Sequence, residues 1–124
     1  MESKKQAYFF NETRKTMVAS KVIMADSFLS RIQGLLWRDR LNRGEGLLLR
    51  PCNSIHMFGM RYPIDAVFLD KAGSVVGLIE NIKPWRVSAV FFKATACLEL
   101  PAGTISSTGT TVGDKLTISS EQPN

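Results

Sequence analysis

The sequence IDAVFLDKAGSVVGLI, residues 64–79, consists of two apolar segments joined by a short polar turn. The segments, residues 64–69 and 74–79, are rich in β-branched and aromatic side chains and have the length of ordinary strands. Between them, Asp70 at the first position and Gly73 at the fourth position are typical of a type I β-turn. This stretch therefore predicts a β-hairpin and makes an antiparallel sheet the starting point of the fold.

Shorter apolar segments on both sides of the hairpin predict further strands. These are expected at residues 7–12, 16–24, 47–49, 55–58, 95–100 and 116–119. One main helix is expected at residues 27–38, where apolar side chains recur at helical spacing and Asp26 or Ser27 can cap the first turn. About eight short strands and one helix predict an α+β fold, mainly antiparallel β, with a curled or barrel-like sheet.

The length of 124 residues fits one domain, residues 1–124, with an ordered core from residue 7 to residue 119. The 44% hydrophobic and 22% charged residues are those of an ordinary globular protein. The apolar run at residues 7–10 is shorter than the roughly 7–15 residues of an export signal. No stretch approaches the roughly 18 apolar residues of a membrane span. The sequence as it stands predicts a soluble, cytoplasmic protein, although removal of a signal from an exported protein would leave the same pattern.

Two cysteines, Cys52 and Cys97, make neither a disulfide framework nor a zinc ribbon, and their apolar neighbours favour buried thiols. A single disulfide between them stays open, since it requires only that the Cα atoms lie within about 7 Å. Cys52, His56, Met57 and Met60 form a string of soft ligands that suits monovalent copper. In an extended segment, however, His56 and Met57 face opposite ways. We therefore expect no metal and no other cofactor.

The formal net charge is +5, and residues 1–50 carry the excess, with ten Lys/Arg against five Asp/Glu. Within this part lies an arginine set, Arg31, Arg38, Arg40, Arg43 and Arg50. They indicate either a site for an anionic partner or a solvated basic face. No RRM, KH or zinc-finger motif is present, so nucleic acid is not the expected partner. The partner stays open, with a small molecule and a protein as the two candidates.

Three polar residues are embedded in the apolar strands. His56 is the one histidine; Asp65 shares a strand row with Val67 and Leu69, and Glu99 lies between two leucines. A buried carboxylate needs a partner or a shifted pKa. One interpretation is a structural network, in which Asp65 and Glu99 accept backbone N–H groups or pair with arginines.

The other interpretation is a pocket lined by His56 and Asp65, with Glu99 nearby and with Arg31 and Arg61 at its sides. In that pocket His56 would act as an acid–base or ligand-binding group, and Asp65 would orient its ring. The standard catalytic motifs are missing: the sequence has no G-x-S-x-G, phosphate loop, G-x-G-x-x-G or H-E-x-x-H. An enzyme is therefore not the first expectation.

Several short motifs occur in a distinctive order along the chain. They are Gly44-Glu45-Gly46-Leu47, Ile55-His56 with Met60, Pro63-Ile64-Asp65, Leu98-Glu99-Leu100-Pro101-Ala102-Gly103 and Gly113-Asp114. Over roughly residues 17–119 the chain resembles the domain of unknown function 192 family of uncharacterised bacterial and archaeal proteins. The resemblance implies one compact β-rich domain without an established activity, substrate or cofactor. Many relatives carry an N-terminal export signal, which leaves the compartment open.

The motif positions of the family fall here on His56, Met60, Asp65, Glu99 and Gly103. The favoured hypothesis is a non-catalytic binding or accessory domain. Its candidate binding residues are His56, Asp65, Glu99, Arg31, Arg61 and Met60. A second hypothesis is a small hydrolase or isomerase that uses His56 with Asp65 or Glu99. A third is a basic module that binds an anionic partner through Arg31, Arg38, Arg40 and Arg43.

Overall fold

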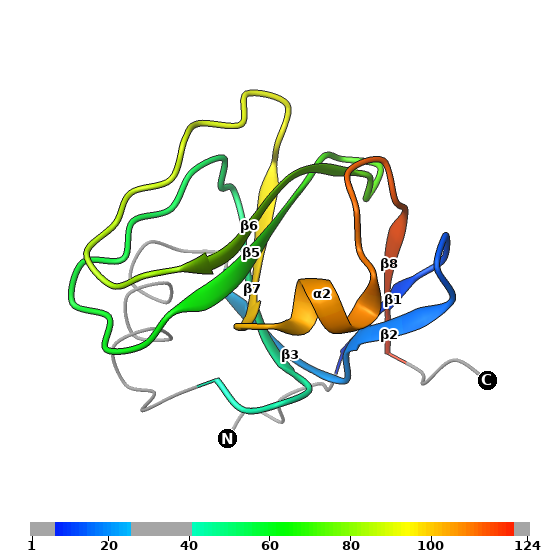
Figure 1. Cartoon of the computed structure of the whole chain (residues 1–124). Helices are drawn as coiled ribbons and strands as arrows, with labels where there is room; N and C mark the ends of the chain where they lie inside the picture. Colours follow the sequence, from blue (N-terminus) through cyan, green and yellow to red (C-terminus); the bar gives the residue numbers. More distant parts are fainter. Residues whose placement is uncertain (1–6, 26–40, 121–124) are drawn as a thin grey trace, which may run out of the picture.

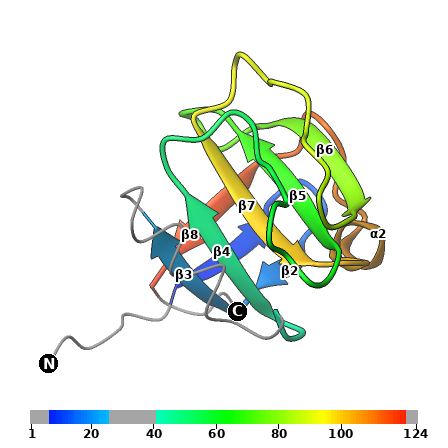
Figure 2. The same cartoon turned by 90° about the vertical axis from the view of Figure 1, so that its left-hand side faces the viewer.

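The computed structural model describes residues 7–25 and 41–120, which form eight strands and one short helix in two sheets (Figure 1). The elements are β1 (Tyr8–Asn11), β2 (Thr16–Ala19), β3 (Lys21–Ala25), β4 (Glu45–Leu49), β5 (Ile64–Leu69), β6 (Val75–Ile82), β7 (Ala96–Pro101), α2 (Thr104–Thr108) and β8 (Leu116–Ser119). One sheet has three strands in the order β2-β1-β8. Figure 2 shows the other sheet nearly face-on, with five strands in the order β3-β4-β7-β5-β6.

The strand-rich α+β fold predicted from the sequence is confirmed. All strand pairs are antiparallel except β3 and β4, which run parallel. The strands are divided between two sheets, and neither sheet closes into a barrel. The predicted hairpin is formed by β5 and β6, with Ala66 opposite Ile79 and Phe68 opposite Gly77.

The turn of this hairpin has the predicted type I pattern. The Gly73 N–H donates to the Asp70 carbonyl at 3.1 Å, and the Asp70 Oδ1 accepts from the N–H groups of Ala72 and Ser74, each at 2.9 Å. Gly73 has a φ of 86°, in the left-handed region. A Cβ atom at this position would lie 2.4 Å from the backbone oxygen of Leu116. Glycine is therefore required here both by backbone conformation and by space.

Replacement of Gly73 by alanine is expected to lower the free energy of unfolding by about 2–4 kcal/mol, because left-handed strain adds to a clash with rigid backbone. Urea denaturation followed by circular dichroism measures the change. Gly113→Ala is the matched control, since Gly113 also has a positive φ, of 97°, but nothing lies within 4 Å of its Cβ position. Equal losses in the two variants would show that the close approach to Leu116 is unimportant.

Alternation along the five-stranded sheet produces two cores, one on each face. The inner core lies between the two sheets and includes Phe9, Val67 and Leu98. The outer core lies on the opposite face and includes Phe68 and Cys97. Because both faces are covered, every residue of β5 is buried, which explains the nearly continuous apolar run in this strand.

Three sequence-based expectations need correction. The strand expected at residues 16–24 is divided at Ser20, whose N–H donates to the Gly44 carbonyl at 2.8 Å, and its halves belong to different sheets. Residues 55–58 form no strand and contribute only a single bridge between His56 and Val87. The short helix α2 was not expected. The helix predicted at residues 27–38 lies outside the described residues.

A helix can cross a membrane only if it is long and apolar enough to span the hydrocarbon core. Over residues 7–25 and 41–120 no helix is long and apolar enough to cross a membrane.

Candidate functional site

Two long loops cross the outer core side by side (Figure 1). We call them the paired loops: residues 50–63, between β4 and β5, and residues 83–95, between β6 and β7. Backbone hydrogen bonds join them, from Met57 N–H to the Arg86 carbonyl at 2.7 Å and from Trp85 N–H to the Met57 carbonyl at 2.8 Å. Ser88 N–H also donates to the Ile55 carbonyl at 2.8 Å. The loops therefore support each other like two irregular strands.

Buried side chains anchor the paired loops to the sheet. Ile55, Met57 and Ala94 belong to the outer core. The Phe91 ring stacks on Phe68 of β5, with ring centroids 4.4 Å apart. The same ring lies directly over Gly77 of β6, where a Cβ atom would come within 2.3 Å of it. The second loop is therefore held against the sheet by an aromatic ring that only glycine accommodates.

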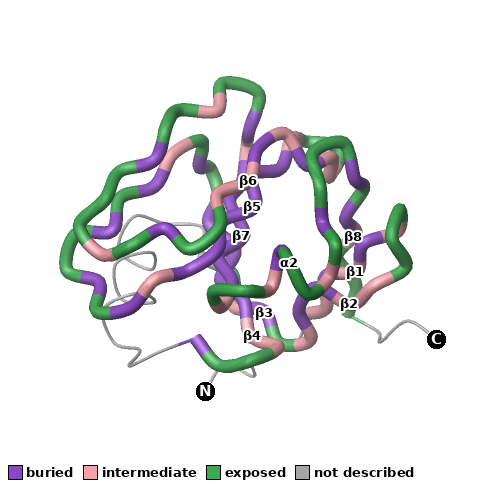
Figure 3. The backbone as a smooth tube through the Cα atoms, viewed as in Figure 1, coloured by how far each residue is buried: buried purple, intermediate pink, exposed green. Residues whose placement is uncertain are grey.

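Between these anchors the paired loops expose large hydrophobic side chains, and Figure 3 shows exposed and buried positions interspersed along them. Five of the eight exposed large hydrophobic residues in the described ranges lie on these two neighbouring loops. They are Phe58 (51% exposed), Trp85 (67%), Val87 (62%), Val90 (47%) and Phe92 (88%). Exposed apolar groups gathered in this way mark interaction sites more often than ordinary surface.

Three of the exposed rings form a row that we call the aromatic rim: His56, Phe58 and Trp85. The rings of His56 and Phe58 are stacked with centroids 4.9 Å apart, and those of Phe58 and Trp85 are tilted with centroids 6.1 Å apart. Trp85 has a φ of 71°, which is unusual for a residue other than glycine. Its backbone N–H, bonded to Met57, holds the ring at this position.

The charge of the paired loops is of one sign. Residues 50–63 and 83–95 contain five basic residues and neither aspartate nor glutamate. The basic residues, all exposed, are Arg50, Arg61, Lys83, Arg86 and Lys93. The surface thus combines aromatic and aliphatic groups with positive charge, which suits a partner with both apolar and anionic groups.

Three of the predicted site residues lie on the first of the paired loops. His56 is exposed in the aromatic rim, and Arg61 is exposed further along the same loop. Met60, in contrast, is buried in the outer core. Of the soft-ligand string, Cys52 and Met57 are also buried while His56 faces solvent. Among the described residues, no three His, Cys, Asp or Glu side chains are grouped so that they could hold a metal ion.

Asp65 lies in β5, and its carboxylate binds three backbone N–H groups. Its Oδ1 accepts from Asn81 at 2.8 Å, and its Oδ2 accepts from Gly103 at 3.1 Å and from Ile105 at 2.8 Å. The side chain is fully buried. It therefore ties the end of β6, where Asn81 has a left-handed φ of 55°, to the start of α2. This geometry is the one that the structural interpretation of Asp65 requires.

Glu99 is buried on the opposite face of the sheet from Asp65. In the pairing of β5 with β7, Ala66 is opposite Glu99 and Asp65 is opposite Leu100. Residues directly opposite in an antiparallel pair point to the same face. Leu100 belongs to the inner core and Ala66 to the outer core, so the two carboxylates are separated by the sheet. They do not line one pocket.

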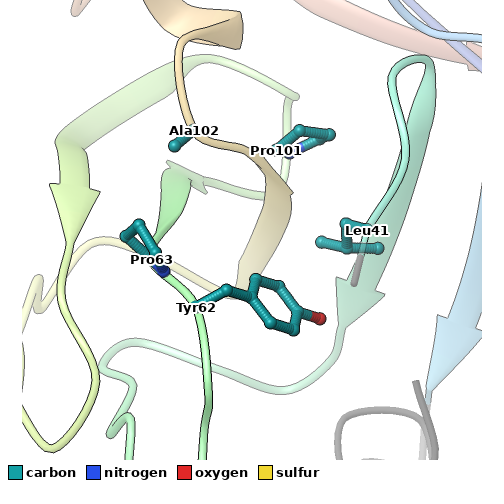
Figure 4. A pocket seen from close by; sticks show the side chains of 5 residues that line it. All are labelled: Leu41, Tyr62, Pro63, Pro101 and Ala102. Carbon is teal, nitrogen blue, oxygen red and sulfur yellow. The ribbon is translucent and has the colours of Figure 1, made fainter. Parts of the chain in front are cut away.

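A cavity of about 320 Å³ lies at the ends of β5 and β7 on the side of Glu99 (Figure 4). Tyr62 and Pro63, which precede β5, face Pro101, the last residue of β7, and Ala102, which follows it. Tyr62 supplies the only polar side-chain group among the described lining residues. Such a lining can accommodate a small apolar group, but it provides no pair of acid and base.

Only one of the other arginines proposed to bind an anionic partner lies within the described residues. Arg31, Arg38 and Arg40 lie outside the described residues. Arg43 is exposed and lines a shallow groove of about 370 Å³ together with hydroxyl side chains of β2 and α2.

The two cysteines are both buried and are not joined in a disulfide, and the Cys52 thiol donates to the Ser54 carbonyl at 3.1 Å.

Far from the paired loops, Asp114 has the clearest shift in pKa. Burial alone would raise the pKa of this carboxyl, but hydrogen bonds outweigh burial and lower it to about 2. The donors are Asn11 Nδ2 and Thr111 N–H, each at 2.9 Å, and Arg14 Nε and Thr111 Oγ1, each at 3.1 Å. This cluster fastens the β1–β2 turn to the segment before β8. Its role is therefore in the fold.

The ordinary pKa of 3.8 applies in the unfolded chain, so Asp114 stabilises the fold above that pH and loses its contribution as the pH falls toward 2. We expect about 2 kcal/mol of stability to depend on this group. Urea denaturation between pH 5 and pH 2 should show a smaller acid loss in Asp114→Asn than in the unchanged protein. Parallel pH profiles of the two proteins would contradict the assignment.

Known proteins place this chain in a family. The sequence matches the DUF192 model, described as "Uncharacterized ACR", over residues 10–118. A UPF0127 protein of the archaeon Thermococcus sibiricus is 33% identical over 110 residues, covering 86% of this chain and 71% of the relative. A UPF0127 protein of Pyrococcus abyssi is 32% identical over 112 residues, covering 86% of this chain and 92% of the relative.

Two solved structures share the fold. A candidate transcription regulator from Sinorhizobium meliloti 1021 has a TM-score of 0.77 at 22% identity, covering 98% of this chain and all of the other. A protein of unknown function from Novosphingobium aromaticivorans has a TM-score of 0.72 at 20% identity, covering 90% of this chain and 82% of the other. At such identities the likeness establishes the fold alone. The family match confirms the resemblance seen in the sequence motifs, and the chain belongs to the uncharacterised DUF192 family.

Proposed function

We propose that this chain is a non-catalytic binding domain and that the paired loops are its binding surface. The observation that carries the proposal is the aromatic rim, which lies on loops that carry five exposed cations and no carboxylate. Apolar groups in water gain roughly 25 cal/mol for each Å² that a partner covers. Rings held by a hydrogen-bonded backbone lose little entropy when they bind. Both features favour association with a partner.

The placement of the polar residues gives less support to catalysis. Both carboxylate oxygens of Asp65 accept backbone N–H groups, so the group has little capacity left to orient a histidine or to take a proton. Glu99 lies on the other face of the sheet. The ring of His56 stacks on Phe58 at the surface, in loops that contain no aspartate or glutamate. His56 therefore suits ring contact with a ligand better than an acid–base role.

The proposal requires that charge on the paired loops controls affinity. Reversal of two charges, in Lys83→Glu with Arg86→Glu, is expected to weaken binding to an anionic partner at least about tenfold at low salt. The probes are heparin, an oligothymidylate and vesicles that contain phosphatidylglycerol. Affinity is measured by fluorescence titration at increasing salt concentration, and the affinity of the unchanged protein should fall as salt rises.

The matched control carries the same charge change elsewhere, in Lys15→Glu with Lys21→Glu, two exposed lysines of the described ranges that lie outside the paired loops and line no groove with them. This variant should bind within about twofold of the unchanged protein, since only long-range charge is altered. Equal weakening in both variants would assign the effect to net charge and contradict the proposal. The proposal would also be contradicted if the unchanged protein bound none of the three probes.

A further inference from the structure

We infer that the partner of the paired loops is the surface of a lipid bilayer that carries anionic headgroups. This inference rests on the proposed function, because it names the partner of the same surface. It goes further in choosing among the anionic partners that have apolar groups. The choice depends on which side chains the loops expose, where their cations lie and how their backbone is bonded.

The exposed apolar groups are not all aromatic. Val87 and Val90 are exposed between Trp85 and Phe92, within one stretch of nine residues, 85–93. A site for single-stranded nucleic acid gains affinity from rings on which bases stack, and valine offers no such face. Lipid tails gain from any apolar surface, aliphatic or aromatic. The valines therefore favour lipid over nucleic acid.

Two cations adjoin the exposed apolar residues in the sequence, and both are exposed. Arg86 lies between Trp85 and Val87, and Lys93 follows Phe92 directly. Long basic side chains can keep their charge at the level of the headgroups while their stems cover apolar surface. Tryptophan prefers the same boundary between headgroups and tails. With no carboxylate in the loops to repel them, anionic headgroups meet charge of one sign.

Four backbone N–H groups of the paired loops, those of Ile55, Met57, Trp85 and Ser88, are also suited to an apolar boundary. Unbonded N–H and carbonyl groups are costly where water is scarce. Trp85, Met57 and Ser88 all have their N–H groups bonded across the pair. The Ile55 N–H is bonded to the Ser88 hydroxyl at 2.8 Å, and that hydroxyl donates to the Ala89 carbonyl at 2.8 Å. The tips can therefore approach the bilayer without exposing these groups.

The test measures binding to two kinds of vesicle, phosphatidylcholine alone and phosphatidylcholine mixed with phosphatidylglycerol. Co-sedimentation gives the affinity, and emission from Trp85, made the sole tryptophan by Trp37→Phe, reports its surroundings. We expect at least about tenfold tighter binding to the mixed vesicles, since each cation near an anionic surface adds to affinity. Emission from Trp85 should shift to shorter wavelength as the ring enters the interface.

The decisive variant removes only aliphatic groups, in Val87→Ser with Val90→Ser. Vesicle binding should weaken about tenfold or more, because buried CH₂ and CH₃ groups are lost, whereas oligothymidylate binding should not change. The control, Val112→Ser with Ile118→Ser, removes exposed apolar groups outside the paired loops and should leave vesicle binding unchanged.

Three outcomes would overturn the inference. Binding of oligothymidylate or heparin without binding of vesicles would do so and would leave the proposed function intact. Vesicle binding that the two valine replacements do not weaken would also overturn it. Binding to none of these probes would overturn the inference and the proposed function together.

Discussion

Asp65→Ala is expected to cost at least about 3 kcal/mol of folding stability. Three backbone N–H groups lose their acceptor at once, those of Asn81, Gly103 and Ile105. A buried donor left without an acceptor costs about 1–3 kcal/mol. The measurement is the free energy of unfolding, from urea denaturation followed by circular dichroism. Asp65→Asn should lose less, because one side-chain oxygen remains to accept.

A matched control is provided by Asp70→Ala. Asp70 also accepts two backbone N–H groups, from Ala72 and Ser74, but it does so in the partly exposed turn of the β5–β6 hairpin. Water can replace it there, so the expected cost is about 1 kcal/mol. If Asp65→Ala cost no more than Asp70→Ala, the carboxylate in β5 would not hold the fold together, and a functional role for it would regain support.

The largest functional effect is expected from the aromatic rim. Phe58→Ala with Trp85→Ala should weaken binding to the best anionic probe by about 100-fold, because two exposed rings that contact the partner are removed. Their side chains are 51% and 67% exposed, so the free energy of unfolding should change by no more than about 0.5 kcal/mol. Fluorescence anisotropy of a labelled probe and urea denaturation provide the two measurements.

Phe92→Ala is an informative companion to that double replacement. Phe92 is the most exposed of the large hydrophobic residues in the described ranges, and no ring contact joins it to the aromatic rim. A loss of affinity confined to the rim would indicate a compact site around His56. A comparable loss from Phe92→Ala would indicate a broad contact along the second loop. Unchanged affinity in both variants would contradict a role for the paired loops.

Local sequence patterns predicted the centre of the fold well. The β5–β6 hairpin and its type I turn follow from alternation and from Asp70 and Gly73, which act within a few residues of each other. The division at Ser20 was not predictable in this way. It depends on the Gly44 carbonyl, which accepts from both Ser20 and Lys21 although it lies more than twenty residues away.

For the candidate site, too, local patterns could not predict contacts between residues far apart in the sequence. Alternation within β5 and β7 correctly predicted that Asp65 and Glu99 are buried among apolar neighbours. It could not predict that they face opposite sides of the sheet, because that depends on the register between the strands, with Asp65 opposite Leu100. The helix α2 was missed for a related reason. It is five residues long, and the carboxylate that binds its first N–H groups comes from β5.

The exposed side chains of residues 84–93 were also missed. This stretch has no strand or helix period, so its apolar residues could not be assigned to a buried or an exposed side. Their exposure is set by two distant contacts, the stacking of Phe91 on Phe68 and the bonding of Met57 to Trp85. One signal was present in the sequence. The stretch WRVSAVFFK, residues 85–93, combines apolar residues with cations, which usually lie at the surface, and it contains no carboxylate.

Hydrogen exchange measured by mass spectrometry, with and without phosphatidylglycerol-containing vesicles, tests the central claim most directly. The paired loops, residues 50–63 and 83–95, should exchange more slowly when the vesicles are bound. The residues that line the groove near Arg43 and the residues around Asp114 should exchange at unchanged rates. Protection at either of those places, with none on the paired loops, would contradict the assignment of the binding surface.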